Sequence, residues 1–376
     1  LAFRLANITR DAIDRRNVQE RVLNADMRDT GKRNAPGETS EFYAESVHDH
    51  ISMWEALEPS TLVLDTIRHG YSIPFDKAPE PPISVCDNNK SARDNASFVE
   101  DAITELLQTG VSRFVSPLSV VKGKKMRLVL DLSLLKEFVA KEKVKFEDMA
   151  TVMPMLPDQG FMTSFDFKNG YHHVKIAAEH QKFLGFKWKN RLYKFSVLPF
   201  GLCSAPHIFT KMLRPFIRKW RLQGKGIAIY LDDGFIWSNS RESCSRDTIQ
   251  IKEHLTQCGW FFSQSKCHWL PEKKCEWLGF VIDLDRFVIT LSSNRVERAK
   301  KILHSLSRNH APSLRDRLRW MGTLASMKLV IPDKEKRRSR AVETAVAHAQ
   351  SNSGVLSPAE STLLKLHQYG HDIPFG

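Results

Sequence analysis

The sequence predicts an α+β fold, and three observations support that class. The segment from 161 to 283 is dominated by short apolar runs with the length of strands, with helical patterns between them. Two of these runs, 226–230 and 234–237, flank a short turn as the arms of an antiparallel hairpin do. After Asp285 the apolar spacing changes to that of amphipathic helices.

The N-terminal part of the chain is predicted to consist of a leader and an extension. Residues 1–45 are polar, charged and rich in Asn and Arg, which predicts a mobile leader or linker. Residues 46–84 form an N-terminal extension, in which prolines from Pro74 to Pro82 interrupt any regular element. The first residue is Leu1 rather than Met, so we expect the chain to be a piece of a longer protein.

A helix and a hairpin are predicted next. Ser97 and Glu100 match a capping box ahead of an apolar stripe, and Gly110 is placed to end the helix. Strands are predicted at 115–121 and 126–132, joined by a basic turn.

Two helices are predicted at the C-terminal side of Asp285. The first buries one apolar side, formed by Val296, Ala299, Ile302, Leu303 and Leu306. The second is predicted to bury Leu314, Leu318, Met321 and Ala325.

The charge balance favours a polyanionic partner. The 376 residues include 56 Lys and Arg against 43 Asp and Glu, a net charge of +13, and 42% of them are hydrophobic, which is enough for a packed core. An excess of positive charge indicates nucleic acid, although it also suits anionic membrane surfaces. No apolar run approaches the roughly 20 residues that span a bilayer, so no membrane partner is expected.

The cysteines indicate a reducing compartment. The six cysteines show no paired Cys-x-x-Cys spacing, which is typical of an intracellular protein, cytoplasmic or nuclear. One group of cysteines and histidines could in principle bind zinc, but its spacings do not match the short ligand pairs of structural zinc folds. Its members are His254, Cys258, Cys267, His268 and Cys275.

Three carboxylates predict the chemistry. Asp232 and Asp233 sit at the tip of the apolar hairpin, where an Asp-Asp-Gly sequence by itself would predict only an ordinary turn. Asp166 ends another strand-like run upstream. Carboxylates that converge from adjacent strands form a hard oxygen site of the kind that holds Mg²⁺, and without a cation they would repel one another and raise their own pKa values.

Six segments in register identify the family that the chain resembles. They resemble the palm and fingers motifs of reverse transcriptases, and the similarity covers roughly residues 85 to 330. The fingers segment is Lys125-Met-Arg127-Leu-Val-Leu-Asp131, and the palm segments are Asp166-Phe-Lys-Asn-Gly-Tyr171, Leu198-Pro-Phe-Gly201, Tyr230-Leu-Asp-Asp233, Gly259-Trp-Phe-Phe-Ser-Gln-Ser-Lys266 and Trp277-Leu-Gly-Phe-Val281.

The resemblance implies a right-hand polymerase with fingers, a palm made of an antiparallel sheet backed by helices, and a helical thumb. The expected divisions are fingers and the start of the palm at 85–160, palm at 161–283 with an inserted fingers segment at about 174–204, thumb at 284–345 and a C-terminal connection at 346–376. RNase H and recombinase domains would belong to the full-length polyprotein and lie outside this chain.

A finer resemblance concerns the type of element. Gly70–Phe75, Asn88–Ala92 and Leu198–Gly201 are most similar to DIRS-type retrotransposons, which integrate by a tyrosine recombinase. The long-terminal-repeat retrotransposons are the alternative.

The resemblance implies a catalytic centre with two Mg²⁺ ions, for which Mn²⁺ could substitute. Asp166 and Asp232 would bridge the metals, with help from the carbonyl of Phe167 and from Asp233. Such a pair of ions activates the primer 3′-oxygen and neutralises the leaving pyrophosphate.

The same resemblance implies a binding site for the incoming dNTP. Arg127, with Lys122 or Lys124, would hold the triphosphate, and Lys266 would donate a proton to pyrophosphate. For each of these lysines a solvated surface charge is the plain alternative. The ring of Tyr171 would lie under the sugar and exclude a 2′-hydroxyl, which favours deoxynucleotides.

The remaining expected contacts involve the pocket floor, the primer and the duplex. Phe200 would form the floor, and Gly201 would allow a close approach of the backbone. Trp277, Leu278 and Gly279 would hold the primer terminus, while Arg295, Arg298 and Lys301 would contact the nucleic-acid backbone or form a solvated face.

The leading hypothesis is therefore an RNA-directed DNA polymerase of a retroelement, which extends a primer on an RNA or DNA template. The alternative is a catalytically decayed, nucleic-acid-binding remnant. Ser133 and Lys136 replace the Arg and Asn that the family shows at these positions, which leaves room for decay. An RNA-dependent RNA polymerase is disfavoured by Tyr171 and by the Tyr230–Asp233 motif.

Overall fold

The computed structural model describes residues 46–76, 81–106, 108–109, 112–122, 126–308 and 313–330. The predicted leader at 1–45, the connection at 346–376 and the end of the predicted thumb lie outside the described residues. All described residues belong to one unit, Glu45–Gly376.

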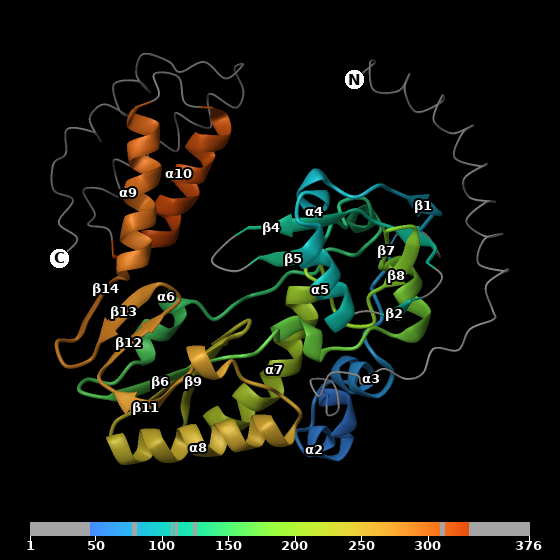
Figure 1. Ribbon diagram of the computed structural model, residues 1–376. Helices are drawn as coiled ribbons and strands as arrows, with labels where there is room; N and C mark the ends of the chain where they lie inside the picture. The colour runs from blue at the N-terminus through green and yellow to red at the C-terminus, as the bar shows by residue number, and fades with distance from the viewer. Residues whose placement is uncertain are drawn as a thin grey trace. The chain divides into compact units, whose positions relative to one another are not determined.

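A four-stranded antiparallel sheet positions the candidate site (Figure 1). Its strand order is β11-β6-β10-β9. The predicted hairpin is confirmed, because β10 pairs with β9, and β6 pairs with the other edge of β10 from Phe161 opposite Ser238 to Asp166 opposite Asp233. The strands are β6 (Phe161–Asp166), β9 (Gly226–Tyr230), β10 (Asp233–Ser238) and β11 (His268–Glu272).

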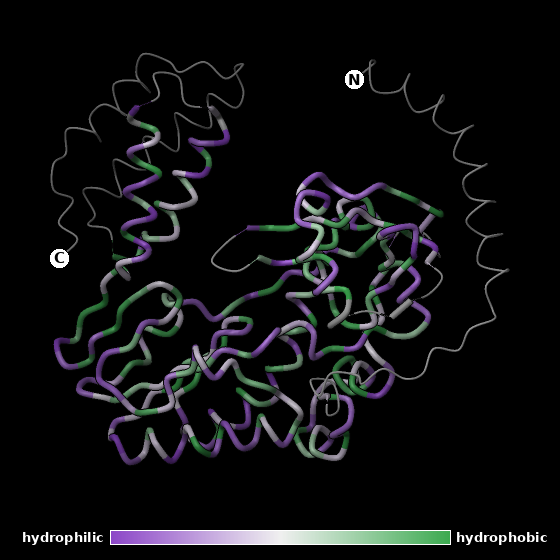
Figure 2. Tube along the Cα trace, viewed as in Figure 1, coloured by the Kyte–Doolittle hydropathy of each residue, from purple (hydrophilic) through white to green (hydrophobic). Residues whose placement is uncertain are grey.

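Two long helices cover one face of this sheet. They are α7 (Ala205–Leu222) and α8 (Arg241–Gln257), and the Ser240 hydroxyl caps α8 by accepting a hydrogen bond from the Ser243 N–H. Ile227, Ile229 and Ile236 share a buried cluster with residues of both helices. In Figure 2 hydrophilic and hydrophobic segments alternate along α8, as expected for a helix with one buried side.

The opposite face of the sheet is also covered. Ala228, Phe235 and Trp237, whose side chains alternate with the isoleucines, form a second cluster with a three-stranded sheet. That sheet has the order β12-β13-β14 and is made of β12 (Lys274–Trp277), β13 (Phe280–Asp283) and β14 (Val288–Leu291). The short helices α6 (Met149–Val152) and η4 (Met153–Met155) lie before β6 in the chain. Strand β14 was not predicted, because four residues carry too short an alternation to distinguish them from a helix start.

The segment from 81 to 130 pairs with the predicted insertion. A five-stranded sheet has the order β1-β3-β7-β8-β2, and β4 pairs with β5 as the predicted hairpin. The strand predicted at 115–121 is divided, however, because its start belongs to β3 in the five-stranded sheet and its end to β4. The strands are β1 (Ser84–Val85), β2 (Gln108–Thr109), β3 (Phe114–Val115), β4 (Leu118–Val121), β5 (Arg127–Leu130), β7 (Gly185–Trp188) and β8 (Arg191–Lys194). Short helical turns connect these parts: η3 (Leu135–Glu137), η5 (Gly170–His173), η6 (Ala178–Phe183) and η7 (Gln264–Lys266).

One helix start differs from the expectation. Helix α5 (Ala96–Leu106) follows directly after α4 (Lys90–Arg93) and begins before Ser97. The predicted capping role of Ser97 is therefore wrong, because the preceding turn of α4 and the Asn95 carbonyl, which accepts from the Val99 N–H, already start the helix.

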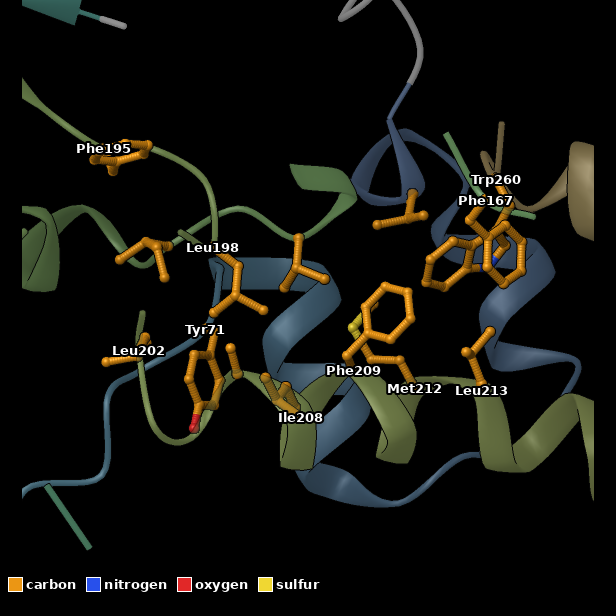
Figure 3. Packing of buried hydrophobic residues seen from close by; sticks show 14 of the residues in the cluster. Tyr71, Phe167, Phe195, Leu198, Leu202, Ile208, Phe209, Met212, Leu213 and Trp260 are labelled. Atoms are coloured by element: carbon orange, nitrogen blue, oxygen red, sulfur yellow. The ribbon is translucent and has the colours of Figure 1, made fainter. Parts of the chain in front are cut away.

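The N-terminal extension packs against the palm helices. It contains η2 (Val47–Asp49), α2 (Ile51–Glu55) and α3 (Thr61–His69). The Trp54 ring lies 5.0 Å from the Phe216 ring, and its indole N–H donates to the Cys258 carbonyl at 3.3 Å. Figure 3 shows the adjoining core, in which Phe209 faces the paired rings of Phe167 and Trp260.

The two predicted C-terminal helices are present. They are α9 (Ser293–Ser307) and α10 (Leu314–Met327). Helix α9 buries Ala299, Ile302 and Leu306, as predicted. The predicted face of α10 is correct at Met321, which is buried, and wrong at Leu318, which is 44% exposed, and at Ala325, which is exposed. The apolar residues that α10 buries are Trp320, Met321, Leu324 and Met327, which share the same helical spacing and include the larger apolar side chains. Among the described residues, no helix has the length and apolarity that crossing a membrane would require.

Two glycines with positive φ give a test of the packing between the extension and the palm. Gly70 has φ +86°, and a Cβ there would lie 2.6 Å from the backbone nitrogen of Ala177. Gly224 has φ +76°, but a Cβ there would meet nothing within 4 Å. We expect Gly224→Ala to cost about 1 kcal/mol of unfolding free energy through the dihedral alone. Gly70→Ala should cost about 3 kcal/mol or more, because the backbones must also separate. Denaturant unfolding of both variants measures the difference, and equal losses would contradict this packing.

Candidate active site

Strand pairing brings the three predicted carboxylates together. Asp166 ends β6 directly opposite Asp233, which begins β10, so both side chains lie on the same face of the sheet. Asp232 occupies the turn before Asp233, and its carbonyl accepts a hydrogen bond from the Phe167 N–H at 2.9 Å. Leu231, the other turn residue, has φ +54°, a strained value for a non-glycine residue.

The environment of this cluster opposes ionisation. Burial, together with the neighbouring charges of Asp232 and Asp166, raises the pKa of Asp233 to about 7. Burial also raises the pKa of Asp232, with the charge of Asp166 adding to the effect. Gly170 fits closely against the cluster, because a Cβ there would lie 3.2 Å from the Cβ of Asp232. The site therefore has carboxylates that a cation would stabilise.

Lys266 supplies one positive charge to this cluster. Its Nζ lies 2.7 Å from both Oδ1 and Oδ2 of Asp166. The Lys266 side chain is 51% exposed whereas that of Asp166 is 9% exposed, so the lysine reaches in from solvent. A metal ion bound by Asp166 would therefore compete with this ammonium.

The carboxylates line an open cleft of about 820 Å³. Most of the residues singled out from the sequence line the same cleft: Arg127, Asp166, Tyr171, Phe200, Asp232, Asp233, Lys266, Trp277, Leu278 and Gly279. Lys122 and Gly201 do not line it, and Lys124 lies outside the described residues.

Aromatic rings fix the part of the cleft around Tyr171. Its ring lies 5.3 Å from the ring of Phe200 and 5.3 Å from that of Phe209, so it is held from two sides. Burial raises the pKa of Tyr171 to about 12, with the charge of Asp232 contributing. The Arg127 guanidinium lies 6.0 Å from the Phe200 ring, at the same end of the cleft.

Gly201 has a structural constraint of its own. It adopts φ +113°, and a Cβ there would overlap the carbonyl oxygen of Leu130 on β5. Because Gly201 has no Cβ, its backbone can lie close against the β4–β5 hairpin, which carries Arg127.

The turn between β12 and β13 borders the carboxylates. The Trp277 indole N–H donates to the Asp233 carbonyl at 3.4 Å, and its ring stacks on Phe235 at 5.0 Å. Leu278 and Gly279 form the turn itself, with φ +48° and +73°. This turn thus lies beside the carboxylate cluster and is held by the buried Trp277.

The three predicted backbone-binding cations occupy different environments. Arg295 donates to the Leu278 carbonyl at 3.0 Å and to the Ser326 carbonyl at 2.9 Å, and its guanidinium lies 4.5 Å from the Phe280 ring. It therefore ties the β12–β13 turn to α10. Arg298 and Lys301 line a separate pocket of about 380 Å³ beside α9 and α10.

Several cleft residues were missed from the sequence. Phe209, His268, Glu276 and Asn294 all line the cleft. His268 was considered only as a member of the zinc alternative, and the other three were given no role, because no local pattern around them points to a site. Their proximity depends on the pairing of distant strands.

The donor chemistry fits divalent cations such as Mg²⁺, because the convergent ligands are carboxylate oxygens. Among the described residues, no three His, Cys, Asp or Glu side chains form a ready-made metal site, and this holds also for the cysteines and histidines whose spacing argued against zinc. At the carboxylates, Lys266 would first have to release Asp166.

The chain is similar to known proteins over the segment that carries most of the residues lining this cleft. Residues 109–282 match the family model described as "Reverse transcriptase (RNA-dependent DNA polymerase)". The chain is 27% identical over 234 residues to the retrovirus-related Pol polyprotein from transposon gypsy of Drosophila melanogaster. The aligned region covers 57% of this chain and 22% of that polyprotein. It is 26% identical over 204 residues to the enzymatic polyprotein of Figwort mosaic virus (strain DxS), covering 51% of this chain and 30% of the relative.

Solved structures show the same fold. The foamy viral protease-reverse transcriptase in complex with an RNA/DNA hybrid superposes with a TM-score of 0.63 at 15% identity, over 89% of this chain and 47% of the other. Its complex with double-stranded DNA gives a TM-score of 0.60 at 19% identity, over 79% of this chain and 61% of the other. The predicted polymerase fold is confirmed. Over residues 109–282 the chain is similar to the reverse transcriptase family, and its listed relatives include Pol polyproteins of retrotransposons.

Proposed function

We propose that the chain is an RNA-directed DNA polymerase of a retroelement, which extends a primer 3′-hydroxyl with dNTPs. The observation that carries the proposal is the convergence of Asp166, Asp232 and Asp233 in the cleft that also contains Tyr171 and Arg127. Phosphoryl transfer needs mostly positioning and charge stabilisation, and this cleft offers groups for both.

Asp166 and Asp232 would hold two Mg²⁺ or Mn²⁺ ions, with the Phe167 carbonyl and Asp233 assisting. When bound, the ions would activate the primer oxygen and neutralise the leaving pyrophosphate. Lys266 already contacts Asp166 at 2.7 Å, so it is within reach of the same centre, where we assign it as the proton donor to pyrophosphate.

Substrate contacts follow from the lining of the cleft. Arg127 would bind the triphosphate, with Lys122 or Lys124 from the adjoining turn. Tyr171 would face the sugar and Phe200 would form the floor, with Gly201 holding the floor against β5. The β12–β13 turn formed by Trp277, Leu278 and Gly279 would support the primer terminus.

The template and primer are proposed partners. The solved relatives are described in complex with double-stranded DNA or an RNA/DNA hybrid. Arg298 and Lys301 on α9 remain our candidates for contact with the nucleic-acid backbone. Arg295 was expected to join them, but its guanidinium donates to the protein carbonyls of Leu278 and Ser326, so we assign it instead to the support of the β12–β13 turn.

We also propose the finer placement as a DIRS-type element and the division into fingers, palm, thumb and connection given above. The chain spans 22% to 30% of the length of the curated relatives compared here. RNase H and recombinase domains are proposed parts of the full-length polyprotein, and the cytoplasm or nucleus is the proposed location.

Primer extension with dNTPs and Mg²⁺ tests the activity. Asp232→Asn should reduce synthesis on RNA and DNA templates by at least roughly a hundredfold, since it removes charge where the transition state needs it. Asp101→Asn, an exposed carboxylate on α5, is the control and should retain full activity. Circular dichroism should show both variants folded. An inactive parent would favour the decayed remnant, and an active Asp232→Asn would contradict the assigned role.

The raised carboxylate pKa values predict a link between pH, metal and stability. In the folded state Asp233 has a pKa of about 7, well above its usual value, so between about pH 4 and pH 7 the folded protein keeps a proton that the unfolded chain has released. Stability should therefore fall as pH rises through this window and be lowest above it.

Asp233→Asn removes this ionisation. Without divalent cations it should raise Tm by several degrees at pH 8, corresponding to about 2 to 4 kcal/mol, and by little at pH 4. Addition of Mg²⁺ should reduce the difference in Tm between Asp233→Asn and the parent at pH 8, because the cation stabilises the parent. Asp101→Asn should show neither effect. A Tm difference that does not change with pH would contradict the electrostatic account.

Tyr171→Val tests the sugar gate. Because Phe200 and Phe209 hold the Tyr171 ring from two sides, the wall is rigid enough to reject an added hydroxyl by shape. The ratio of kcat/KM for dNTP over rNTP should fall by about tenfold or more. Tyr193→Val is the control, because Tyr193 stacks on Phe186 outside the cleft. If the dNTP/rNTP ratio of kcat/KM stays at the parental value in Tyr171→Val, the assignment of Tyr171 as the sugar gate would be wrong.

A further inference from the structure

His173 is a buried histidine that connects two backbone segments beside the candidate active site. It is 7% exposed and packs among the rings of Phe167, Trp260 and Phe261. Its Nδ1 lies 2.9 Å from the Gly170 carbonyl, and its Nε2 lies 3.0 Å from the Phe261 N–H. Neither the motif resemblance nor the lining of the cleft singles it out.

The two partners determine a single tautomer. The backbone N–H of Phe261 can only donate, so Nε2 of His173 must accept. The ring proton therefore resides on Nδ1, which donates to the Gly170 carbonyl. Burial lowers the pKa of His173 to about 4, so the neutral form that makes both bonds is the one present at neutral pH.

The Nδ1 bond holds the turn that carries Tyr171. Asn169 has φ +54°, and the turn continues through Gly170 into η5. Gly170 lies against Asp232, since a Cβ there would be 3.2 Å from the Asp232 Cβ. By holding the Gly170 carbonyl, His173 can therefore fix the position of Tyr171, which follows Gly170, and of Asp232, which Gly170 contacts.

The Nε2 bond holds the segment that carries Lys266. This segment runs along the end of β6 through two backbone hydrogen bonds, from the Lys168 N–H to the Phe261 carbonyl at 2.9 Å and from the Ser263 N–H to the Asp166 carbonyl at 2.8 Å. The turn η7 then places Lys266 on Asp166. His173 adds the side-chain bond to Phe261 at the far end of this pairing.

We propose that His173 is a positioning residue that sets two separable properties of the active site. Its bond to Gly170 sets sugar discrimination by fixing Tyr171, and its bond to Phe261 sets the rate of nucleotide addition by fixing the segment that carries Lys266. The inference rests on the proposed polymerase function and adds to it a residue that touches neither substrate nor metal.

Two conservative variants separate the two bonds. Asn places its amide near the position of Nδ1, so His173→Asn keeps the Gly170 bond and loses the Phe261 bond. Gln reaches the position of Nε2, so His173→Gln keeps the Phe261 bond and loses the Gly170 bond. A misplacement of about 1 Å at a reacting group can cost up to about a hundredfold, so intermediate effects are expected.

The measurement is single-nucleotide addition of dNTP and rNTP by the parent and both variants, with Tm recorded for each. His173→Gln should lower the dNTP/rNTP ratio of kcat/KM by about tenfold while its kcat for dNTP stays within a few-fold of the parent. His173→Asn should keep the parental ratio and lower kcat for dNTP by about tenfold.

His48 provides a matched control. It is also a bridging histidine, although half-buried, with Nδ1 2.8 Å from the Ile67 carbonyl and Nε2 accepting from the Lys175 N–H at 2.7 Å, but it lies in the N-terminal extension and does not line the cleft. His48→Asn and His48→Gln should lower Tm without changing the ratio.

Equal changes in both His173 variants, no change in either, or the same changes in the His48 variants would overturn the inference. Tyr171→Val in the same assay distinguishes failure of the His173 inference from failure of the proposed function. If the parent polymerises and the dNTP/rNTP ratio of kcat/KM falls in Tyr171→Val, the proposed function still holds. A parent that does not polymerise would overturn both.

Discussion

Mutual repulsion among the clustered carboxylates of Asp166, Asp232 and Asp233, of which the first is buried and the other two are half-buried, is the constraint on which the rest of the structure depends. Strand pairing forces Asp166 and Asp233 to face each other, and burial raises the pKa of Asp233 to about 7. Such a cluster destabilises the fold when it is ionised, so the surrounding packing must offset that cost. The sheet is accordingly buried on both faces, by α7 and α8 on one side and by β12–β14 on the other.

The same packing leaves the three carboxylates accessible to solvent from the cleft. Trp277 donates to the Asp233 carbonyl and stacks on Phe235, so the core reaches to the edge of the carboxylates. Lys266 provides a removable counter-charge, because its side chain is half exposed and approaches Asp166 from solvent. A lysine on a flexible stem can give way to divalent cations more easily than a buried arginine could. In the proposed function, divalent cations would therefore replace the Lys266 ammonium at Asp166.

Much of the fold could be predicted because its signals are local. The strands at 161–165, 226–230 and 234–237 and the burial on α9 follow from short-range periodicity, and the order of motifs indicated which residues would share one cleft. The failures depended on tertiary context. Leu318 was expected to be buried, but the Trp320 side of α10 buries more apolar area. Arg295 was expected to contact phosphate, but in the folded chain its guanidinium donates to the Leu278 and Ser326 carbonyls. The two hydrogen bonds of the His173 ring could not be predicted, because no sequence pattern marks them.

A crystal structure of the chain with primer–template, an incoming dNTP and Mn²⁺ tests the central claim most directly, because anomalous scattering locates the manganese ions. The account predicts two ions about 4 Å apart, both contacting Asp166 and Asp232, with Lys266 displaced from the 2.7 Å contact with Asp166. Lys266 still bound to Asp166, with no ion between the carboxylates in the presence of an ordered dNTP, would contradict it.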